Sequence, residues 1–168
     1  SLTPAAPYAG EAALRDFTKV LETVKPTLIF VPHPADTHQD HWATGAFAVA
    51  AFEALRASGA EWTTQTRVFE YLVHWNKWPW PSGIGINLRF TLPPGLEDFS
   101  RWESVEVVQE NRYHKSRAIA EYRSQGLTND AFNYLISFSR AQELFAVYEP
   151  LVIRSPGSSV DIPNPNSG

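Results

Sequence analysis

Residues 27–59 contain a short apolar run, a polar loop and a long alanine-rich segment, and this succession limits the fold more than any other part of the chain. Residues 27–31 read Thr-Leu-Ile-Phe-Val and are stopped by Pro32, which is typical of a buried strand. The segment that starts at 40 or 41 and ends at 57 is apolar almost all round and is closed by Gly59, which predicts a helix buried on several sides. A buried strand that leads into a buried helix indicates a layered α/β domain.

Further helices and strands are predicted around this unit, together with one long loop. Apolar residues at three- and four-residue steps predict an amphipathic helix over 11–24, and β-forming residues predict a strand over 67–75. Residues 76–103 read as a loop because they hold Trp-Pro-Trp-Pro and several glycines, and loops of this length are often functional. The other expected elements are an edge strand over 104–109, helices over 111–125 and 130–140, and a strand or helical turn over 144–153.

The composition excludes several classes of protein. The chain has 168 residues, 43% of them apolar, and a net charge of −4, so it can bury a core and has no basic block for nucleic acid. No stretch approaches the roughly 18 apolar residues that a membrane span needs. Because cysteine is absent, any metal must be held by His, Asp or Glu.

The chain also lacks methionine and begins Ser-Leu-Thr-Pro, so we expect it to be a trimmed piece of a longer protein. No signal-peptide pattern is present at its start. Because the N-terminus is expected to be missing, the localisation stays open, with the cytoplasm slightly favoured. We predict one unit over 1–154, the C-terminal part of a single domain, and a tail over 155–168 that is rich in Pro, Ser and Asn.

Three of the five histidines and two aspartates fall within residues 33–41, in the loop between the predicted strand and helix. Ligands of open α/β sheets bind at this place, at the carboxyl ends of the strands. His41 is expected in the first turn of the helix and His38 just before it, while Asp40, at the cap, can orient a neighbouring imidazole. A metal ligand, a supporting carboxylate and a free histidine are the components of a metal hydrolase. The structural alternative is a capping aspartate beside solvated histidines.

The same residues resemble a motif of a known family. The run 32–45 (PHPADTHQDHWATG) looks like the second motif, D-x-H-x-D-H-x-A-x-G, of the PIG-L/LmbE-like family of zinc-dependent N-acetylglucosaminyl deacetylases. The resemblance spans roughly residues 11–148. It includes residues 71–74 with 78–79, residues 140–145 (RAQELF), and a pattern K-x-x-A-I-x-x-Y-x-S-Q formed by Lys115, Ala118, Ile119, Tyr122, Ser124 and Gln125.

This resemblance implies an α/β, Rossmann-like three-layer sandwich with a mostly parallel sheet, of which the chain covers the C-terminal portion. It also implies a zinc-dependent hydrolase in which a metal-activated water removes the N-acetyl group from an N-acetylglucosamine-type sugar or glycoconjugate. In such an enzyme His41 would be a zinc ligand, and His38 would stabilise the oxyanion and protonate the leaving amine. Asp40 would tune the orientation and charge of His38. Asp36 would contact the zinc ligands without binding the metal itself.

The chain departs from the family in one respect. The family's other zinc ligands and its general base belong to an N-terminal P-H-P-D-D-E motif, which this sequence lacks. Residues 33–36 (His-Pro-Ala-Asp) imitate it, but alanine stands at the position of the base, and we interpret the likeness as chance. We therefore expect an N-terminal segment of the same protein, separate from this chain, to supply the remaining ligands of Zn²⁺.

Aromatic residues near the end of the predicted strand 67–75 offer a wall for a sugar, because exposed rings stack on its apolar face. We take His74 and Trp75 as candidate substrate-binding or supporting residues, although tryptophans in a Trp-Pro-Trp-Pro loop also serve packing. Two other functions stay open. One is a catalytically inactive, carbohydrate-binding relative, and the other is a different metal hydrolase built on His33, Asp36 and His41.

Overall fold

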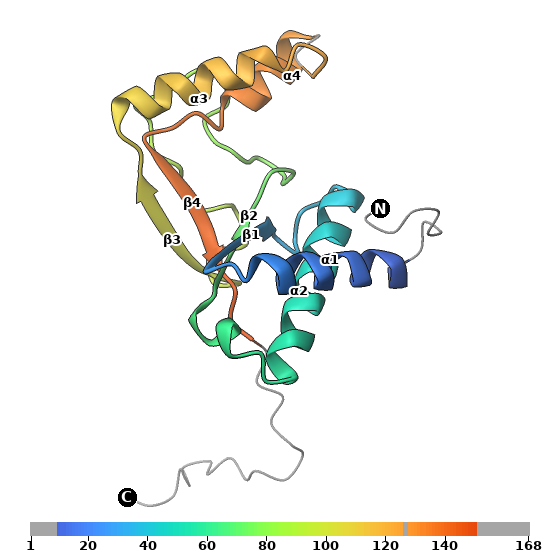
Figure 1. Ribbon diagram of the computed structural model, residues 1–168. Helices are drawn as coiled ribbons and strands as arrows, with labels where there is room; N and C mark the ends of the chain where they lie inside the picture. Colours follow the sequence, from blue (N-terminus) through green and yellow to red (C-terminus); the bar gives the residue numbers. More distant parts are fainter. Residues whose placement is uncertain (1–9, 126–127, 151–168) are drawn as a thin grey trace, which may run out of the picture.

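The computed structural model describes residues 10–125 and 128–150, and these residues form an α/β fold with a four-stranded sheet (Figure 1). The predicted α/β class is thereby confirmed. The elements, in chain order, are α1 (Gly10–Val24), β1 (Leu28–Pro32), α2 (Gln39–Ala57), a 3-10 helix η1 (Glu61–Gln65), β2 (Arg67–Tyr71), β3 (Arg101–Glu106), α3 (Gln109–Glu121), α4 (Asn129–Ile136) and β4 (Gln142–Val147).

The described sheet is mixed, with the strand order β1-β2-β4-β3. β1 and β2 are parallel, with Leu28 opposite Arg67 and Pro32 opposite Tyr71, because α2 carries the chain back between them. β4 is antiparallel to both β2 and β3, since α3 and α4 return the chain from β3 to the start of β4. One parallel pair and two antiparallel pairs do not make the mostly parallel sheet that was predicted.

Helices α1 and α2 pack together and cover one face of the sheet at β1 and β2 (Figure 1). α2 approaches the end of β1 so closely that a Cβ atom on Gly45 would lie 2.4 Å from the carbonyl oxygen of Pro32. The loop after β1 is therefore held against the first turns of α2. The core between these elements contains Leu21, Val31, Ala48, Ala51, Phe52, Leu55 and Val68.

The opposite face of the sheet carries a group of phenylalanines that is open at β1. The Phe30 ring stacks on Phe69, with centroids 5.5 Å apart, and also contacts Phe145 at 5.1 Å. Leu28 and Phe30 are nevertheless 51% and 50% exposed. Within the described residues, no second helical layer covers this end of the sheet, so the three-layer arrangement is incomplete here.

A second core fixes the long loop between β2 and β3. It is built from Leu72, Trp78, Phe90 and Leu96. The fully buried Arg140 fastens the loop from the other side, because its guanidinium donates hydrogen bonds to the carbonyl oxygens of Pro81 and Gly83.

Most predicted elements are present with shifted ends. The helix predicted over 111–125 is α3 and ends at Glu121, and the helix predicted over 130–140 is α4 and ends at Ile136. The region predicted over 144–153 overlaps strand β4, which begins earlier, at Gln142, and ends at Val147. The strand predicted over 67–75 stops at Tyr71, for a reason given below. The predicted tail, 155–168, lies outside the described residues. Among the helices of the described part, none combines the length and apolar character that crossing a membrane requires.

Candidate functional site

Asp36, in the loop after β1, is the centre of the site. It is 4% exposed, and its Oδ1 accepts a hydrogen bond from the backbone N–H of His38 at 2.9 Å. Its Oδ2 accepts from the backbone N–H groups of Val73 and His74, both at 3.0 Å. These two N–H groups therefore bond to a side chain instead of a neighbouring strand, which explains why β2 ends at Tyr71.

His41 projects from the first turn of α2 onto the same carboxylate. Its Nδ1 lies 3.2 Å from Asp36 Oδ2. An ionised carboxylate only accepts hydrogen bonds, so Nδ1 carries the proton and Nε2 presents its lone pair. The His41 side chain is 32% exposed, and within the described part of the chain its Nε2 has no hydrogen-bond partner. This arrangement fits a zinc ligand with its supporting carboxylate.

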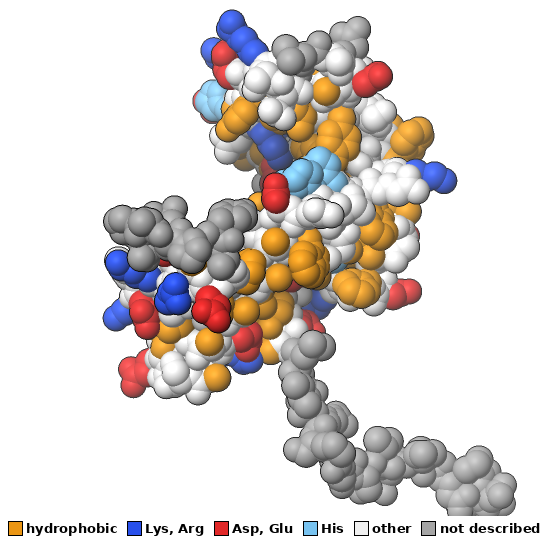
Figure 2. Space-filling model, turned by 90° about the vertical axis from the view of Figure 1, so that its right-hand side faces the viewer, with side chains coloured by type: hydrophobic (Ala, Val, Ile, Leu, Met, Phe, Trp, Pro, Cys, Tyr) orange, Lys and Arg blue, Asp and Glu red, His pale blue; other side chains and the backbone are white. Residues whose placement is uncertain are grey.

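Two more imidazoles surround His41. The ring centroid of His38 lies 4.8 Å from that of His41, and the centroid of His74 lies 4.9 Å from His41 and 5.2 Å from His38. Figure 2 shows histidine side chains together in the middle of one face, where the part with α3 and α4 meets the part with α1 and α2, with an acidic side chain beside them. The three histidines, here called the histidine cluster, thus form one partly exposed polar surface.

The charges of the site follow from burial and hydrogen bonding. Burial alone would raise the pKa of Asp36, but the hydrogen bonds from His38, His74, Val73 and His41 outweigh it and hold this pKa below its ordinary value. Burial lowers the pKa of His74, and positive charge on either neighbouring imidazole lowers it further, while Asp36 acts in the opposite direction. Asp36 is therefore ionised at neutral pH, and His74 favours its neutral form.

Tyr134, from α4, is a member of the site that the sequence did not reveal. Its ring stacks on His74 with centroids 5.8 Å apart and an interplanar angle of 21°. Its hydroxyl group donates to the carbonyl oxygen of Val73, and its oxygen lies 3.5 Å from His74 Nδ1. Tyr134 is 60 residues away from His74 in sequence, so no local pattern pointed to it.

The prediction that Asp40 caps α2 is wrong. The residue at the N-cap is His38, and its side chain makes no capping hydrogen bond. Asp40 lies in the first turn and is exposed. Within the described residues its carboxylate bonds to none of the histidines, and Asp36 provides the orienting contact that was predicted for Asp40.

His33 is placed away from the histidine cluster. It is fully buried, its ring stacks on Trp102 with centroids 5.4 Å apart, and its Nε2 lies 3.0 Å from Ser100 Oγ. Its Nδ1 accepts a hydrogen bond from the backbone N–H of Ala35 at 3.0 Å. Burial lowers the pKa of His33 to about 4, against the opposing effect of Asp36. His33 is thus a neutral core histidine, and the structure does not join it to His41 in a metal site.

The tryptophans near the site differ in their roles. Trp75 donates from Nε1 to the carbonyl oxygen of Pro94 at 2.8 Å and packs against the second core, as expected of a structural residue. Trp78 is buried, whereas Trp80 is 61% exposed. A cavity of about 290 Å³ lies close by, lined by Tyr71, Leu72, Val73, Trp78, Phe90, Lys115, Phe138, Glu143, Leu144 and Phe145.

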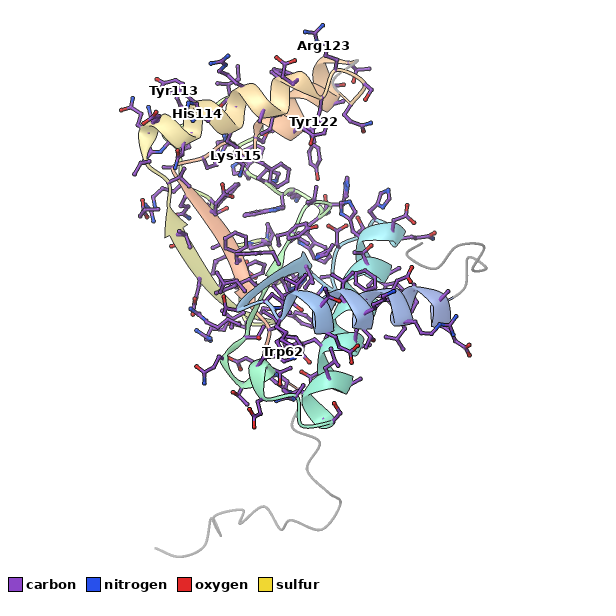
Figure 3. All side chains as sticks on the ribbon, in the orientation of Figure 1. Trp62, Tyr113, His114, Lys115, Tyr122 and Arg123 are labelled. Atoms are coloured by element: carbon purple, nitrogen blue, oxygen red, sulfur yellow. The ribbon has the colours of Figure 1, made fainter. Side chains whose placement is uncertain are left out.

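The helix that resembles the family's C-terminal pattern borders this region. Lys115, on the wall of the cavity, forms an ion pair with Glu143 at 2.5 Å. Tyr122 is 67% exposed and points from the end of α3 toward the space above α1 and α2, whereas Arg123 points away from it (Figure 3). Lys115 therefore faces β4, whereas Tyr122 points toward the side of α1 and α2.

The residues present fit one part of a zinc site. His41 is oriented as a ligand, and an oxygen of Asp36 supports it. Within residues 10–125 and 128–150, however, no group of three His, Asp or Glu side chains is arranged to hold a metal ion.

No known protein family, curated protein or solved structure matches this chain.

Proposed function

We propose that this protein is a zinc-dependent hydrolase that removes the N-acetyl group from an N-acetylglucosamine-type sugar or glycoconjugate. The observation that carries the proposal is the pair of Asp36 and His41, in which a buried carboxylate holds Nδ1 of the imidazole at 3.2 Å and leaves Nε2 free. Asp36 lies in the loop after β1 and His41 in the first turn of α2, in the segment that resembles the deacetylase motif.

The roles of the chain's own residues follow from their positions. Zinc, when bound, would supply an activated water and polarise the acetamide carbonyl. His41 offers the ligand atom, and Asp36 fixes its tautomer. His38 is exposed and lies beside His41, so it can donate a hydrogen bond to the carbonyl oxygen and a proton to the leaving amine. Asp40, exposed in the first turn of α2, would act on His38 through its charge.

An N-terminal segment of the same protein completes the site in this proposal. A catalytic zinc ion takes three protein ligands, and the described residues contain no such set. β1 offers the place for the segment, because it is an edge strand whose Leu28 and Phe30 are half exposed. A parallel strand added there would cover both side chains and bring the sheet closer to the mostly parallel, three-layer arrangement that the resemblance implies.

The test is an assay for released amine and acetate with the protein as it is encoded in full. N-acetylglucosamine and its glycosides are the substrates, and the enzyme is used with Zn²⁺, after chelation, and after Zn²⁺ is restored. We expect turnover that chelation removes and zinc restores. Turnover that is indifferent to chelation would refute the proposal. Binding of the sugars without release of acetate would also refute it, and would favour the inactive carbohydrate-binding relative.

A further inference from the structure

His74 repeats the arrangement that fits His41 as a metal ligand. In His41, Nδ1–H donates a hydrogen bond to Asp36 Oδ2, and Nε2 is left free. In His74, the neighbouring atom is the hydroxyl oxygen of Tyr134, 3.5 Å from Nδ1. The Tyr134 hydroxyl group already donates its proton to the carbonyl oxygen of Val73, so toward His74 it can only accept. Nδ1 of His74 therefore carries the proton, and its Nε2 is free as well.

The His74 ring is also fixed in position. Its backbone N–H donates to Asp36 Oδ2 at 3.0 Å, and its carbonyl oxygen accepts from the backbone N–H of Thr37 at 2.9 Å. In addition to these backbone hydrogen bonds, the imidazole ring of His74 stacks on the ring of Tyr134. His38 differs, because within the described residues its ring has no hydrogen-bond partner, and it sits at the exposed N-cap of α2. Of the two imidazoles beside His41, His74 is the one held in place.

The separation of the two held rings suits a shared ion. Two imidazoles on one tetrahedral zinc ion, with Zn–N distances of about 2.0–2.1 Å, have ring centroids about 5 Å apart. The centroids of His41 and His74 are 4.9 Å apart. We propose that His74 is a second metal ligand of this chain, and that His41 and His74 together bind Zn²⁺ or a similar divalent transition-metal ion through their Nε2 atoms.

This inference rests on the proposed function for the identity of the metal and extends the set of ligands. It assigns two ligands to the chain, so the N-terminal segment needs to supply one more instead of two. His38 stays outside the metal's ligands and keeps its free imidazole for proton transfer. The hydroxyl oxygen of Tyr134 and the carboxylate of Asp36 then have equivalent tasks, because each faces the Nδ1 atom of one ligand.

The experiment is a zinc titration of the 168-residue chain without any partner, followed by calorimetry and by ¹⁵N NMR of the imidazole nitrogens. The variants are His41→Gln, His74→Gln and His38→Gln, and the matched control is His114→Gln, an exposed histidine of α3 (Figure 3). We expect His41→Gln and His74→Gln each to weaken zinc binding by about tenfold or more, and the other two to change it by less than about threefold. In the wild-type chain, the Nε2 signals of His41 and His74 should shift together on addition of zinc.

Three results would overturn the inference. Wild-type affinity in His74→Gln together with a loss in His41→Gln would remove His74 from the ligands and leave the proposed function intact. An unshifted His74 Nε2 signal in the wild-type chain would do the same, and this measurement does not depend on the folding of a variant. Binding weaker than about 1 mM by the wild-type chain would overturn the two-histidine site as a whole. Conversely, zinc held by both histidines in a protein that releases no acetate would refute the hydrolase and leave the metal site standing.

Discussion

Replacing Asp36 by asparagine tests how far one buried carboxylate holds the candidate site together. Asp36 accepts four hydrogen bonds, from the backbone N–H groups of His38, Val73 and His74 and from Nδ1 of His41. An amide has one oxygen and one NH₂ group, so in either orientation an N–H donor faces another donor. An unpaired buried donor costs about 1–3 kcal/mol, and hydrogen bonds to a charged acceptor contribute about 1.5–3 kcal/mol each. We expect the free energy of unfolding to fall by about 3 kcal/mol.

The measurement is urea unfolding, followed by tryptophan fluorescence near neutral pH, with thermal unfolding in parallel. For a chain of this size, a loss of about 3 kcal/mol corresponds to a Tm lower by about 6–12 °C. The matched control is Asp40→Asn, the same chemical change at an exposed position four residues along, where we expect a loss of no more than about 1 kcal/mol. Equal unfolding midpoints for the two variants would refute the reasoning.

The effect also has a defined dependence on pH. Hydrogen bonds to the carboxylate outweigh burial and hold the pKa of Asp36 below its ordinary value of 3.8. A group whose pKa is lower in the folded state contributes stability that is present above the unfolded pKa and lost as pH falls through the folded one. The difference in stability between wild type and Asp36→Asn should therefore be constant near neutral pH and shrink below about pH 4.

Three further predictions concern the site and its support. In the complete protein, His41→Ala should abolish zinc retention and acetate release. His38→Ala should keep the metal and lower the rate by about 100-fold or more. Metal analysis and an assay for the released amine would check both. Burial raises the pKa of Glu70 from 4.5 to about 7, so the folded protein keeps a proton that the unfolded chain releases. The free energy of unfolding should therefore decline as pH rises across that interval. Glu70→Gln should lessen the decline, as urea unfolding at about pH 5 and pH 7.5 would show. Gly45→Ala would place a Cβ 2.4 Å from the Pro32 carbonyl oxygen. The free energy of unfolding should therefore fall by about 1–3 kcal/mol in the same assay. An unchanged free energy of unfolding would mean that α2 can move away freely.

The local elements of this fold could be predicted from the sequence, because their causes are local. The apolar run before Pro32 is β1, and the alanine-rich segment that ends before Gly59 is α2. The partners of the strands could not be predicted in the same way. Phe145 in β4 lies opposite Glu103 in β3 because two helices bring the chain back, and nothing in either strand specifies that pairing.

The candidate site was predictable in part for the same reason. His38 and His41 share one loop and one helix turn, so their proximity follows from spacing. His74 was a candidate whose position relative to His38 and His41 was not predicted. Its contact with them depends on the parallel pairing of β1 and β2, whose carboxyl ends share one edge of the sheet. The task of Asp36 was underestimated because two of its partners are backbone N–H groups 37 and 38 residues away, which have no signature in the sequence.

The single carboxylate beneath the histidine cluster also has a consequence for how this part of the molecule opens. Asp36 joins the amide of His38, in the first loop, to those of Val73 and His74, in the second. The bonds to Val73 and His74 break if either segment moves away, because the acceptor belongs to the first segment and the donors to the second. In amide hydrogen exchange they should behave as one cooperative unit, with a common protection that disappears at once when the carboxylate is removed. The imidazole rings of His38 and His74 would then lose their relative positions together when this unit opens.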